Sequence, residues 1–581
     1  MKKLKGKRRR ERHRAAATTS ETTTWQAQWL APVLVVLLTT FVYLPALQNG
    51  FVNFDDDKNI LTNLHYRGLG WSQLRWMFTT SHVGHYIPLT WMTLGLDYLL
   101  WGINPAGYHL TNLLLHSLNA GLLYLLAIQL LGKAFPSSMA GGRFTRPLGA
   151  AFAALLFAVH PLRAESVAWV TERRDVLSGL FYLLATLAYL QACELRVEGT
   201  TARRKWYWYW ASVGFFGLAL FSKSMAVSLL AVFVVLDVYP LRRLGWGSGR
   251  WLGSEAGKVW AEKIPYVLIA AAASLIAFVA LVRLGNMVPR SVLGPADRVA
   301  ISLYGLAFYL WKTLVPFQLS PLYQLKTPLN PLAWPFVLSG VVVLVISGLA
   351  IGLRRRFPAL AAVWVSYVVT LLPVLGIFQN GSQIVADRYS YLSCLGWAIL
   401  AGAGLLYCLK TWASGPRAAF LAAALPAVVV AGLAGLTWKQ VQVWHDSETL
   451  WRHTIDIGQE SSIGHFDLGV VLSNQGRMED AIHHYRRALE ITPAYVEAHN
   501  NVGNALAKRG ELEEAMRHYQ RALKIDPNFA MAHTNLGNVL AMRGELEEAI
   551  GHFRQALRIQ PKFPEAQDSL TRALALKRKR E

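Results

Sequence analysis

The sequence predicts an all-α protein in two parts, a polytopic bundle of transmembrane helices followed by an array of short helical repeats. Apolar residues make up 53% of the 581 residues and charged residues only 16%, whereas soluble proteins carry about 25% charged residues. The apolar residues gather in long runs between residues 30 and 440. From residue 444 the composition is that of a soluble domain, and one pattern returns every 34 residues.

The long apolar runs predict membrane spans, because a helix needs about 20 apolar residues to cross a bilayer. The candidates are 29–48, 108–131, 147–160, 176–193, 207–222, 224–240, 264–283, 299–316, 334–353, 359–377, 389–409 and 418–437.

The positive charge predicts sidedness. The net charge is +23, but Lys and Arg form short clusters between the apolar runs, as in the cytosolic loops of membrane proteins. We find no basic stripe beside stacking aromatics, so we exclude nucleic acid as a partner. Nine Lys/Arg in the first 14 residues place the N-terminus in the cytosol and the loop from Gly50 to about Ala106 outside it. We read the first run as a retained span rather than a signal peptide, since no small-residue cleavage site follows it.

One run conflicts with this alternation. If 299–316 crossed the membrane, the basic cluster Arg354-Arg355-Arg356 would lie outside the cytosol. We therefore interpret 299–316, which is followed by Pro316 and Pro321, as a broken, re-entrant element or as one lying at the outer face. About eleven spans remain, and the C-terminal part then lies outside the cytosol.

The 34-residue pattern is typical of the tetratricopeptide repeat (TPR), a helix pair that stacks into an α-solenoid. The repeated positions hold a glycine, an alanine, an aromatic residue and a proline: Gly469/Gly503/Gly537, Ala481/Ala515/Ala549, Tyr485/Tyr519/Phe553 and Pro493/Pro527/Pro561. The small residues allow the helices to approach, and the proline ends the second helix. Such repeats bind a peptide or another protein.

These patterns predict five segments. They are a basic cytosolic N-terminus at 1–28, a transmembrane domain at 29–440, a connecting helix and partial repeat at 441–461, three TPR repeats at 462–563, and a capping helix with a basic tail at 564–581.

The first outer loop carries three adjacent carboxylates, Asp55, Asp56 and Asp57. Such a cluster suits a general base with a raised pKa or a divalent cation, and a solvated acidic turn is the simpler alternative. We expect Asp55 and Asp56 to be catalytic. No cofactor is firmly indicated, and a divalent cation at Asp55/Asp56 is left open.

A polar stripe lies inside the apolar run 108–131. His109, Asn112, His116 and Asn119 are spaced by 3, 4 and 3 residues, which places them on one helical face. Polar groups within a span usually face the bundle interior or a wet cavity. Interhelical hydrogen bonding is the alternative, and no third ligand completes a metal site.

Three cations from different outer loops are candidate ligands for a phosphate group. Arg174 follows Glu165 and Glu172 and precedes Asp175, so simple ion pairing is the alternative interpretation. Lys223 and Arg388 also fall at the predicted outer face. Guanidinium groups bind phosphate in a bidentate fashion, which favours donor phosphate binding by Arg174, Lys223 and Arg388. We expect His109, Asn112, His116, His160, Glu165 and Asp175 to line the cavity.

The motifs occur together in an order that resembles the transmembrane and tetratricopeptide-repeat (TMTC) proteins and their bacterial relatives. They are Asp55-Asp56 with Asn63, Tyr108 to His116, His160-Pro161 with Glu165 and Arg174-Asp175, Ser222-Lys223-Ser224, and Ala386 to Tyr391. That group is similar to the protein O-mannosyltransferases of the GT-C class of glycosyltransferases.

The resemblance implies a GT-C-like bundle and a hexosyltransferase that moves a sugar from a polyprenyl phosphate-linked donor to a protein Ser/Thr hydroxyl. It implies an active site on the extracytoplasmic face, with the TPR groove binding the acceptor. Few repeats suggest a bacterial relative and thus a bacterial inner membrane. Two alternatives are a non-catalytic membrane-anchored TPR scaffold for envelope assembly and, less favoured because no inverted repeat is evident, a transporter of lipid-linked sugar.

Overall fold

The computed structural model describes residues 29–580 except 136–144, 195–201, 246–250, 285–287, 378, 380, 412–415 and 458–459. The predicted basic N-terminus at 1–28 therefore lies outside the described residues. The described part is helical apart from one two-stranded sheet, which confirms the all-α prediction. It divides into two compact units, and the chain passes from one to the other after His445, five residues beyond the predicted boundary.

The first unit starts with a helix at Trp29–Val42. Its longer helices are α2 Trp71–Thr79, α3 Pro88–Trp101, α4 Pro105–Ala134, α5 Thr145–Ala158, α7 Arg173–Glu194, α8 Ala202–Ser222, α9 Leu229–Val238, α10 Ser254–Ala261, α11 Ile264–Leu284, α12 Pro295–Leu314, α13 Trp334–Gly352, α14 Pro358–Leu371, α16 Leu395–Thr411 and α17 Pro416–Gln442. The short elements are η1 Leu44–Gln48, η2 Asp57–Leu61, η4 Pro161–Arg163, α6 Ala164–Ala168, η5 Val170–Glu172, η6 Ser224–Ser228, η7 Leu372–Val374, η8 Asp387–Tyr389, α15 Ser390–Ser393 and the strands β1 Tyr323–Gln324 and β2 Gln383–Val385.

The protein is a membrane protein. Five helical stretches are long and apolar enough to cross a bilayer, and two bent pairs, with bends of 56° and 59°, raise this number to seven. Shorter apolar helices cover Trp29–Val42, Ser224–Val238 and Pro358–Val374. Large apolar side chains such as Leu268, Leu344 and Val428 are at least 65% exposed, which suits contact with lipid. The count of about eleven spans stays a prediction.

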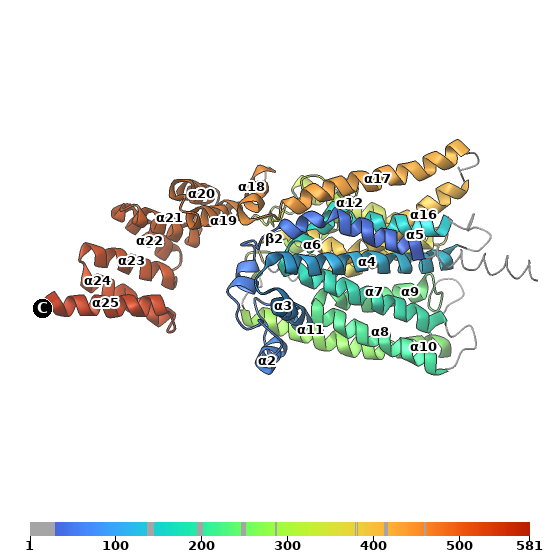
Figure 1. The fold of residues 1–581 in the computed structure, drawn as a ribbon, viewed down its shortest axis with the longest axis horizontal. Coiled ribbons are helices and arrows are strands. Elements are labelled where there is room, and N and C mark those ends of the chain that lie inside the picture. Colours follow the sequence, from blue (N-terminus) through green and yellow to red (C-terminus); the bar gives the residue numbers. More distant parts are fainter. Residues whose placement is uncertain are drawn as a thin grey trace, which may run out of the picture. The chain divides into compact units, whose positions relative to one another are not determined.

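The long helices lie side by side (Figure 1), and small residues set their spacing. A Cβ on Gly402 of α16 would lie 2.4 Å from the backbone oxygen of Gly149 in α5, so these helices cross backbone to backbone. Small residues have the same role at many membrane helix contacts.

The segment predicted at 299–316 is α12, one continuous helix rather than a broken element. It carries Asp297, Arg298 and Lys312, and it is not among the apolar stretches able to span. The chain before and after α12 contacts one loop, because Val288 N donates to Gln379 O at 3.1 Å and Leu325 N donates to Ser382 O at 2.6 Å. The segments before and after α12 therefore meet the same loop, although a 20-residue helix is about 30 Å long.

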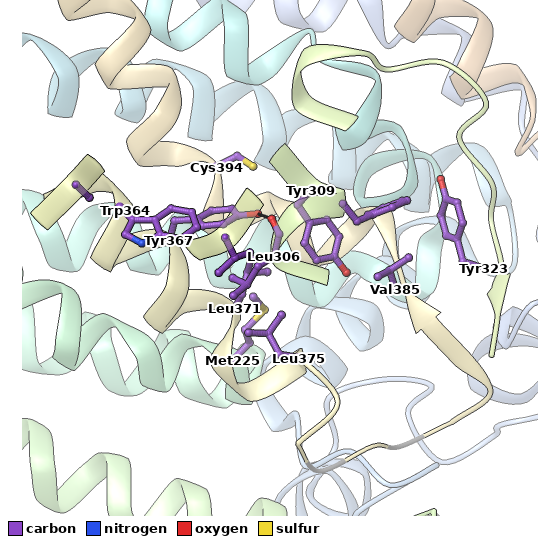
Figure 2. Close-up of a cluster of buried hydrophobic side chains, with 13 residues drawn as sticks. Met225, Leu306, Tyr309, Tyr323, Trp364, Tyr367, Leu371, Leu375, Val385 and Cys394 are labelled. Atoms are coloured by element: carbon purple, nitrogen blue, oxygen red, sulfur yellow. Dashed lines mark hydrogen bonds between the residues drawn. The ribbon is translucent and has the colours of Figure 1, made fainter. Parts of the chain in front are cut away.

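A buried apolar cluster holds α12 to the same loop region. Leu306 and Tyr309 of α12 pack with Leu375 and Val385, and Tyr367 donates to the backbone oxygen of Leu306 at 2.6 Å (Figure 2). The strands add to this contact, with Tyr323 of β1 paired antiparallel to Val385 of β2.

The second unit is the repeat array. After α18 Ser447–Asp456 come the pairs α19 Ser462–Asn474 with α20 Met478–Ile491, α21 Val496–Lys508 with α22 Leu512–Ile525, and α23 Ala530–Arg543 with α24 Leu546–Ile559, and α25 Pro564–Arg580 follows. The three helix pairs lie between Ser462 and Ile559. Gly476, Gly510 and Gly544 adopt φ between 80° and 86° in the turns, a conformation that glycine adopts without strain.

Candidate active site

Asp56 is buried and holds two loops together. Its Oδ1 accepts hydrogen bonds from Thr171 N at 3.0 Å and Thr171 Oγ1 at 2.7 Å, and its Oδ2 accepts one from Val52 N at 3.1 Å. Burial raises the pKa of Asp56 to about 7, although the hydrogen bonds from Thr171 and Val52 act to lower it. Three of roughly four acceptor positions on this carboxylate are occupied.

The neighbouring acids are more accessible. Asp55 has a φ of 72°, a left-handed conformation that Asp tolerates better than most residues. Its side chain is 38% exposed and lies 3.7 Å from Lys58 Nζ. Asp57 begins η2. The acidic cluster therefore separates into one buried carboxylate and two partly exposed ones.

The three predicted phosphate ligands converge in one buried cluster of charges. Arg174 comes from the start of α7, Lys223 from the residue before η6, and Arg388 from η8. All three contact Glu172, with Arg174 Nε and Lys223 Nζ at 3.1 and 3.2 Å from Oε2 and Arg388 Nε at 3.2 Å from Oε1.

Two further carboxylates complete this cluster, so it holds three cations and three anions. Lys223 Nζ lies 2.5 Å from Asp175 Oδ1. Glu165 pairs with the Arg388 guanidinium and accepts a hydrogen bond from its backbone N at 2.8 Å. The side chains of Arg174 and Lys223 are 10% and 12% exposed. The ion pairing that the sequence left as an alternative is therefore present.

Trp169 joins the acidic loop to this cluster. Its ring lies 4.7 Å from that of Phe54, 5.5 Å from that of Trp444 and 5.5 Å from the Arg388 guanidinium carbon. Thr171, which binds Asp56, directly precedes Glu172. Trp169 and Thr171 thus connect the first loop to the charge cluster.

His85, from the first loop, also lies near these charges. Burial lowers the pKa of His85, and the cations Arg174, Lys223 and Arg388 lower it further. Nothing in the sequence around His85 indicates that it lies near the charge cluster.

The polar stripe on α4 supports the neighbouring loops. All four side chains are fully buried. Asn112 donates to Val167 O and Trp169 O at 3.2 Å, and Asn119 donates to Val176 O at 2.7 Å and Tyr391 OH at 2.9 Å. His116 contacts Ala158 O and Tyr391 OH at 2.9 Å, and His109 contacts Gly50 O at 3.3 Å. These bonds fit the alternative of interhelical hydrogen bonding.

An apolar cavity of about 1190 Å³ lies between α5, α12, α13, α16 and α17. Of the six residues expected to line a cavity, only His160 lines this one. Its Nδ1 accepts from Leu162 N at 3.2 Å, so its Nε2 donates to Thr313 O at 3.0 Å. His109, Asn112, His116, Glu165 and Asp175 are instead buried among the partners given above.

Arg163 lines the same cavity and went unassigned in the sequence. Its Nε and Nη1 are buried and have no hydrogen-bond partner within the described part of the chain. The guanidinium carbon lies 4.9 Å from the ring of Phe157 and 5.9 Å from that of Tyr391. A buried cation at one wall of an apolar cavity is a candidate anchor for an amphipathic anion.

Across the described ranges, no group of three or more His, Cys, Asp or Glu side chains could hold a metal ion.

Comparisons with known proteins cover both units. The family model described as "TPR repeat" matches residues 469–510 and 503–542, and that described as "Tetratricopeptide repeat" matches 530–563. Two solved TPR proteins, YrrB and the first TPR domain of RPAP3, show 20% and 19% identity, cover 39% and 20% of this chain and 89% and 91% of their own, and have TM-scores of 0.20.

The curated relatives carry a common name. Human "Protein O-mannosyl-transferase TMTC2" is 33% identical over 223 residues, which cover 37% of this chain and 25% of the relative. Human TMTC1 is 27% identical over 511 residues, covering 81% and 56%, and mouse TMTC4 is 27% identical over 509 residues, covering 78% and 66%. The chain thus spans between a quarter and about two thirds of these relatives' lengths. The chain is similar to the TMTC proteins over up to 81% of its length and carries tetratricopeptide repeats at 469–563.

Proposed function

We propose that the protein is a membrane glycosyltransferase that moves a sugar from a polyprenyl phosphate-linked donor to a Ser/Thr hydroxyl on the extracytoplasmic face. The repeats bind the acceptor protein or a partner. The names of the TMTC relatives support a mannosyltransferase-like, hexosyl-transferring activity of the GT-C class.

The convergence of Arg174, Lys223 and Arg388 is the observation that carries this proposal. They come from separate parts of the chain and meet around Glu172. Thr171 connects this cluster to Asp56 and the acidic first loop. A base beside a cationic group is the arrangement that a hydroxyl attack with an anionic leaving group requires.

In the proposed reaction Asp55 takes the proton of the acceptor hydroxyl. The hydroxyl oxygen bonds to the anomeric carbon as the bond from that carbon to the phosphate oxygen breaks, which inverts the configuration. The lipid phosphate leaves with the bonding electrons, and the cations stabilise its charge. We assign the base to Asp55 because it is partly exposed, whereas three hydrogen bonds commit Asp56 to positioning the loop.

Arg174 and Lys223 keep 10% and 12% of their side-chain surface exposed. Arg174 uses Nε and Nη2 on Glu172, and a guanidinium has five N–H donors. A phosphate oxygen thus binds the remaining donors or replaces a carboxylate oxygen.

The apolar cavity supports a lipid-linked donor. It lies among helices that span or approach the membrane, and Arg163 at its wall is only two residues from Glu165 in the charge cluster. An isoprenoid chain suits a cavity with this lining.

Two contacts support the sidedness. The segments flanking α12 converge on one loop, which agrees with a helix that does not cross the membrane fully. Gly50 N donates to His445 O at 2.8 Å, so the chain leaves the membrane unit beside the acidic loop. A repeat array tethered to the membrane unit raises the local concentration of an acceptor that it binds. Location in a bacterial inner membrane stays a prediction.

The test is glycan transfer in membranes from a prenyl phosphate mannose to a Ser/Thr peptide. Asp55→Asn is expected to lower the rate by at least about 10²-fold, the lower range for a positioned base. Glu255→Gln is the matched control, because Glu255 is 81% exposed and forms a surface salt bridge with its neighbour Lys258. Normal transfer by both Asp55→Asn and Asp56→Asn would exclude the proposal.

A non-catalytic scaffold is the second candidate, favoured by the pairing of all three cations with carboxylates. If the protein is a scaffold, the repeats should still recruit the partner in Asp55→Asn. If it is a transferase, Asp55→Asn should recruit the partner without transferring sugar, whereas the unmodified chain should transfer it.

A further inference from the structure

Each of the three repeats contains a pair of histidines that face one another. His465 pairs with His484, His499 with His518 and His533 with His552, at Nδ1 to Nδ1 distances of 3.0, 3.1 and 2.9 Å. The first member lies on the first helix of the repeat and the second on the second helix. Both positions recur every 34 residues, so the pairs are a constant part of the repeat.

The two rings of each pair meet head-on. Their centroids are 5.2, 5.3 and 5.2 Å apart, which exceeds the nitrogen distance by about one ring width. One Nδ1 must therefore donate a proton to the lone pair of the other.

The direction of this hydrogen bond follows from the second nitrogen. His499 Nε2 lies 3.2 Å from Pro493 O, and His533 Nε2 lies 3.1 Å from Pro527 O. A carbonyl oxygen only accepts, so these Nε2 atoms carry the protons and the Nδ1 atoms of His499 and His533 are acceptors. His518 and His552 are then the Nδ1 donors. A second proton on the acceptor Nδ1 would place two N–H groups against each other.

We propose that these histidine pairs form an acid-sensitive latch, which holds the two helices of each repeat together at neutral pH and releases them when the surroundings become acidic. The latch lies in the repeats alone and does not depend on the proposed transferase activity. Protonation of the histidines opens the latch.

The surrounding charges do not provide a substitute for the shared proton. The groups that act electrostatically on the first pair are Arg452 of α18 and His483, Arg487, Asp480 and Glu490 of α20. Those that act on the second pair are Arg486 of α20 and Glu514 and Arg521 of α22. Glu548 of α24 acts on the third pair. Arg486 pairs with Glu514 at 3.1 Å and Arg487 pairs with Glu490. Burial, followed by the partner imidazole, lowers the pKa of His484 and of His518 to about 4.

Protonation favours the open state of each pair. In an unfolded repeat both imidazoles bind protons below their ordinary pKa of about 6.5. A closed pair takes up at most one extra proton, because its acceptor Nδ1 cannot be protonated while it faces the N–H group of its partner. Each pair therefore weakens the closed state as pH falls, by about tenfold between pH 7.5 and 5.5.

A metal ion fits this geometry less well than a proton. Zinc lies about 2.0–2.1 Å from each histidine nitrogen, so an ion between two head-on rings needs a wider separation than 3.1 Å. Metal addition at neutral pH is accordingly a control in the experiment.

The experiment is hydrogen–deuterium exchange of the full chain in detergent at pH 7.5 and 5.5, corrected for the intrinsic pH dependence of exchange. Protection in α19 to α24 is expected to fall about tenfold for each pair that opens. Glutamine both donates and accepts, so the triple variant His484→Gln, His518→Gln, His552→Gln should lose less than threefold. His483→Gln, an exposed neighbour outside the pairs, should leave the acid response of the second and third repeats as it is in the unmodified chain.

Equal loss in the triple variant and the unmodified chain would overturn the proposal, as would constant protection of the unmodified chain at both pH values. If the triple variant does not fold, His552→Gln alone should reduce the acid response in α23 and α24 while the first two repeats keep theirs. Increased protection of these helices by added zinc at pH 7.5 would also count against a proton latch.

Discussion

Thr171 binds the Asp56 carboxylate twice through the same oxygen, with its backbone N at 3.0 Å and its hydroxyl at 2.7 Å from Oδ1. Because Thr171 directly precedes Glu172, this contact links the acidic first loop to the charge cluster. More than 100 residues separate the loop from the cluster in the sequence. The hydrogen bond from the Thr171 hydroxyl to the Asp56 carboxylate connects them directly.

Replacing Thr171 by Val should therefore disturb both stability and transfer. Val keeps the volume of Thr but lacks its donor, and a hydrogen bond to a charged group contributes roughly 1.5–3 kcal/mol. A lower unfolding midpoint and slower glycan transfer are expected, whereas Thr171→Ser should retain both. Equal behaviour of the Val and Ser variants in the two assays would show that the hydroxyl does not position Asp56.

The buried Asp56 should also make stability depend on pH. Its pKa is about 7 in the folded chain, against an ordinary value of 3.8. Between these values the folded chain holds a proton that the unfolded chain has released, so the free energy of unfolding falls as pH rises from about 4 to about 7. The slope is at most about 1.4 kcal/mol per pH unit.

Thermal unfolding of the full chain in detergent from pH 4.5 to 7.5 measures this effect. The difference between the unmodified chain and Asp56→Asn isolates it, because Asn does not titrate. The Asn variant should gain stability relative to the unmodified chain as pH rises. A constant difference across this range would contradict the raised pKa.

The helices of the membrane unit could be predicted because apolar length is a local property of the sequence. Each apolar run coincides with a helix, including α12, where the clusters of charge rather than the hydropathy indicated an unusual element. The helices α2 and α3 were missed inside the first loop, since neither reaches the length of a span.

The repeats could be predicted down to individual contacts. A Cβ on Gly503 would lie 2.6 Å from the ring of Tyr519, the close approach that the alternation of small and aromatic residues indicated. Gly503→Ala should cost roughly 1–3 kcal/mol through overpacking.

Gly551 is the matched control for this change. It lies on α24, and a Cβ added there would meet nothing within 4 Å, so Gly551→Ala should stabilise the helix by roughly 0.5–1 kcal/mol. Chemical unfolding followed through the protection of α21 to α24 measures both effects. A neutral Gly503→Ala would mean that the ring of Tyr519 shifts at little cost.

The division of labour within the site could not be predicted, since burial and pairing depend on tertiary contacts. Nothing in the run of three aspartates distinguishes Asp56, which is buried, from Asp55, which is 38% exposed. The convergence of Arg174, Lys223 and Arg388 could be expected from the side predicted for all three, but their common partner Glu172 could not. The histidine pairs did carry a signal, because His recurs with the same 34-residue period.

Filling the apolar cavity should weaken donor binding without disturbing the charges. Ala401 of α16 lines the cavity, and Ala401→Phe places a ring in it. The KM for a prenyl phosphate sugar should rise at least about tenfold, while kcat at saturating donor changes little, as for an interaction made equally in the ground and transition states. Ala427→Phe on the exposed surface of α17 is the control. An unchanged KM in Ala401→Phe would exclude the cavity as the site of the lipid chain.

Glu172 should be the residue on which the cation cluster depends. It is fully buried and contacts Arg174, Lys223 and Arg388, so Glu172→Gln leaves three cations facing only Glu165 and Asp175. Removing one partner of a buried ion pair costs about 3–5 kcal/mol, and the unfolding midpoint should fall accordingly. Because the cause is excess positive charge, the double variant Glu172→Gln with Arg174→Met should be more stable than the sum of the two single effects allows. Thermal unfolding of the four proteins completes this cycle, and strictly additive losses would mean that Glu172 and Arg174 act independently.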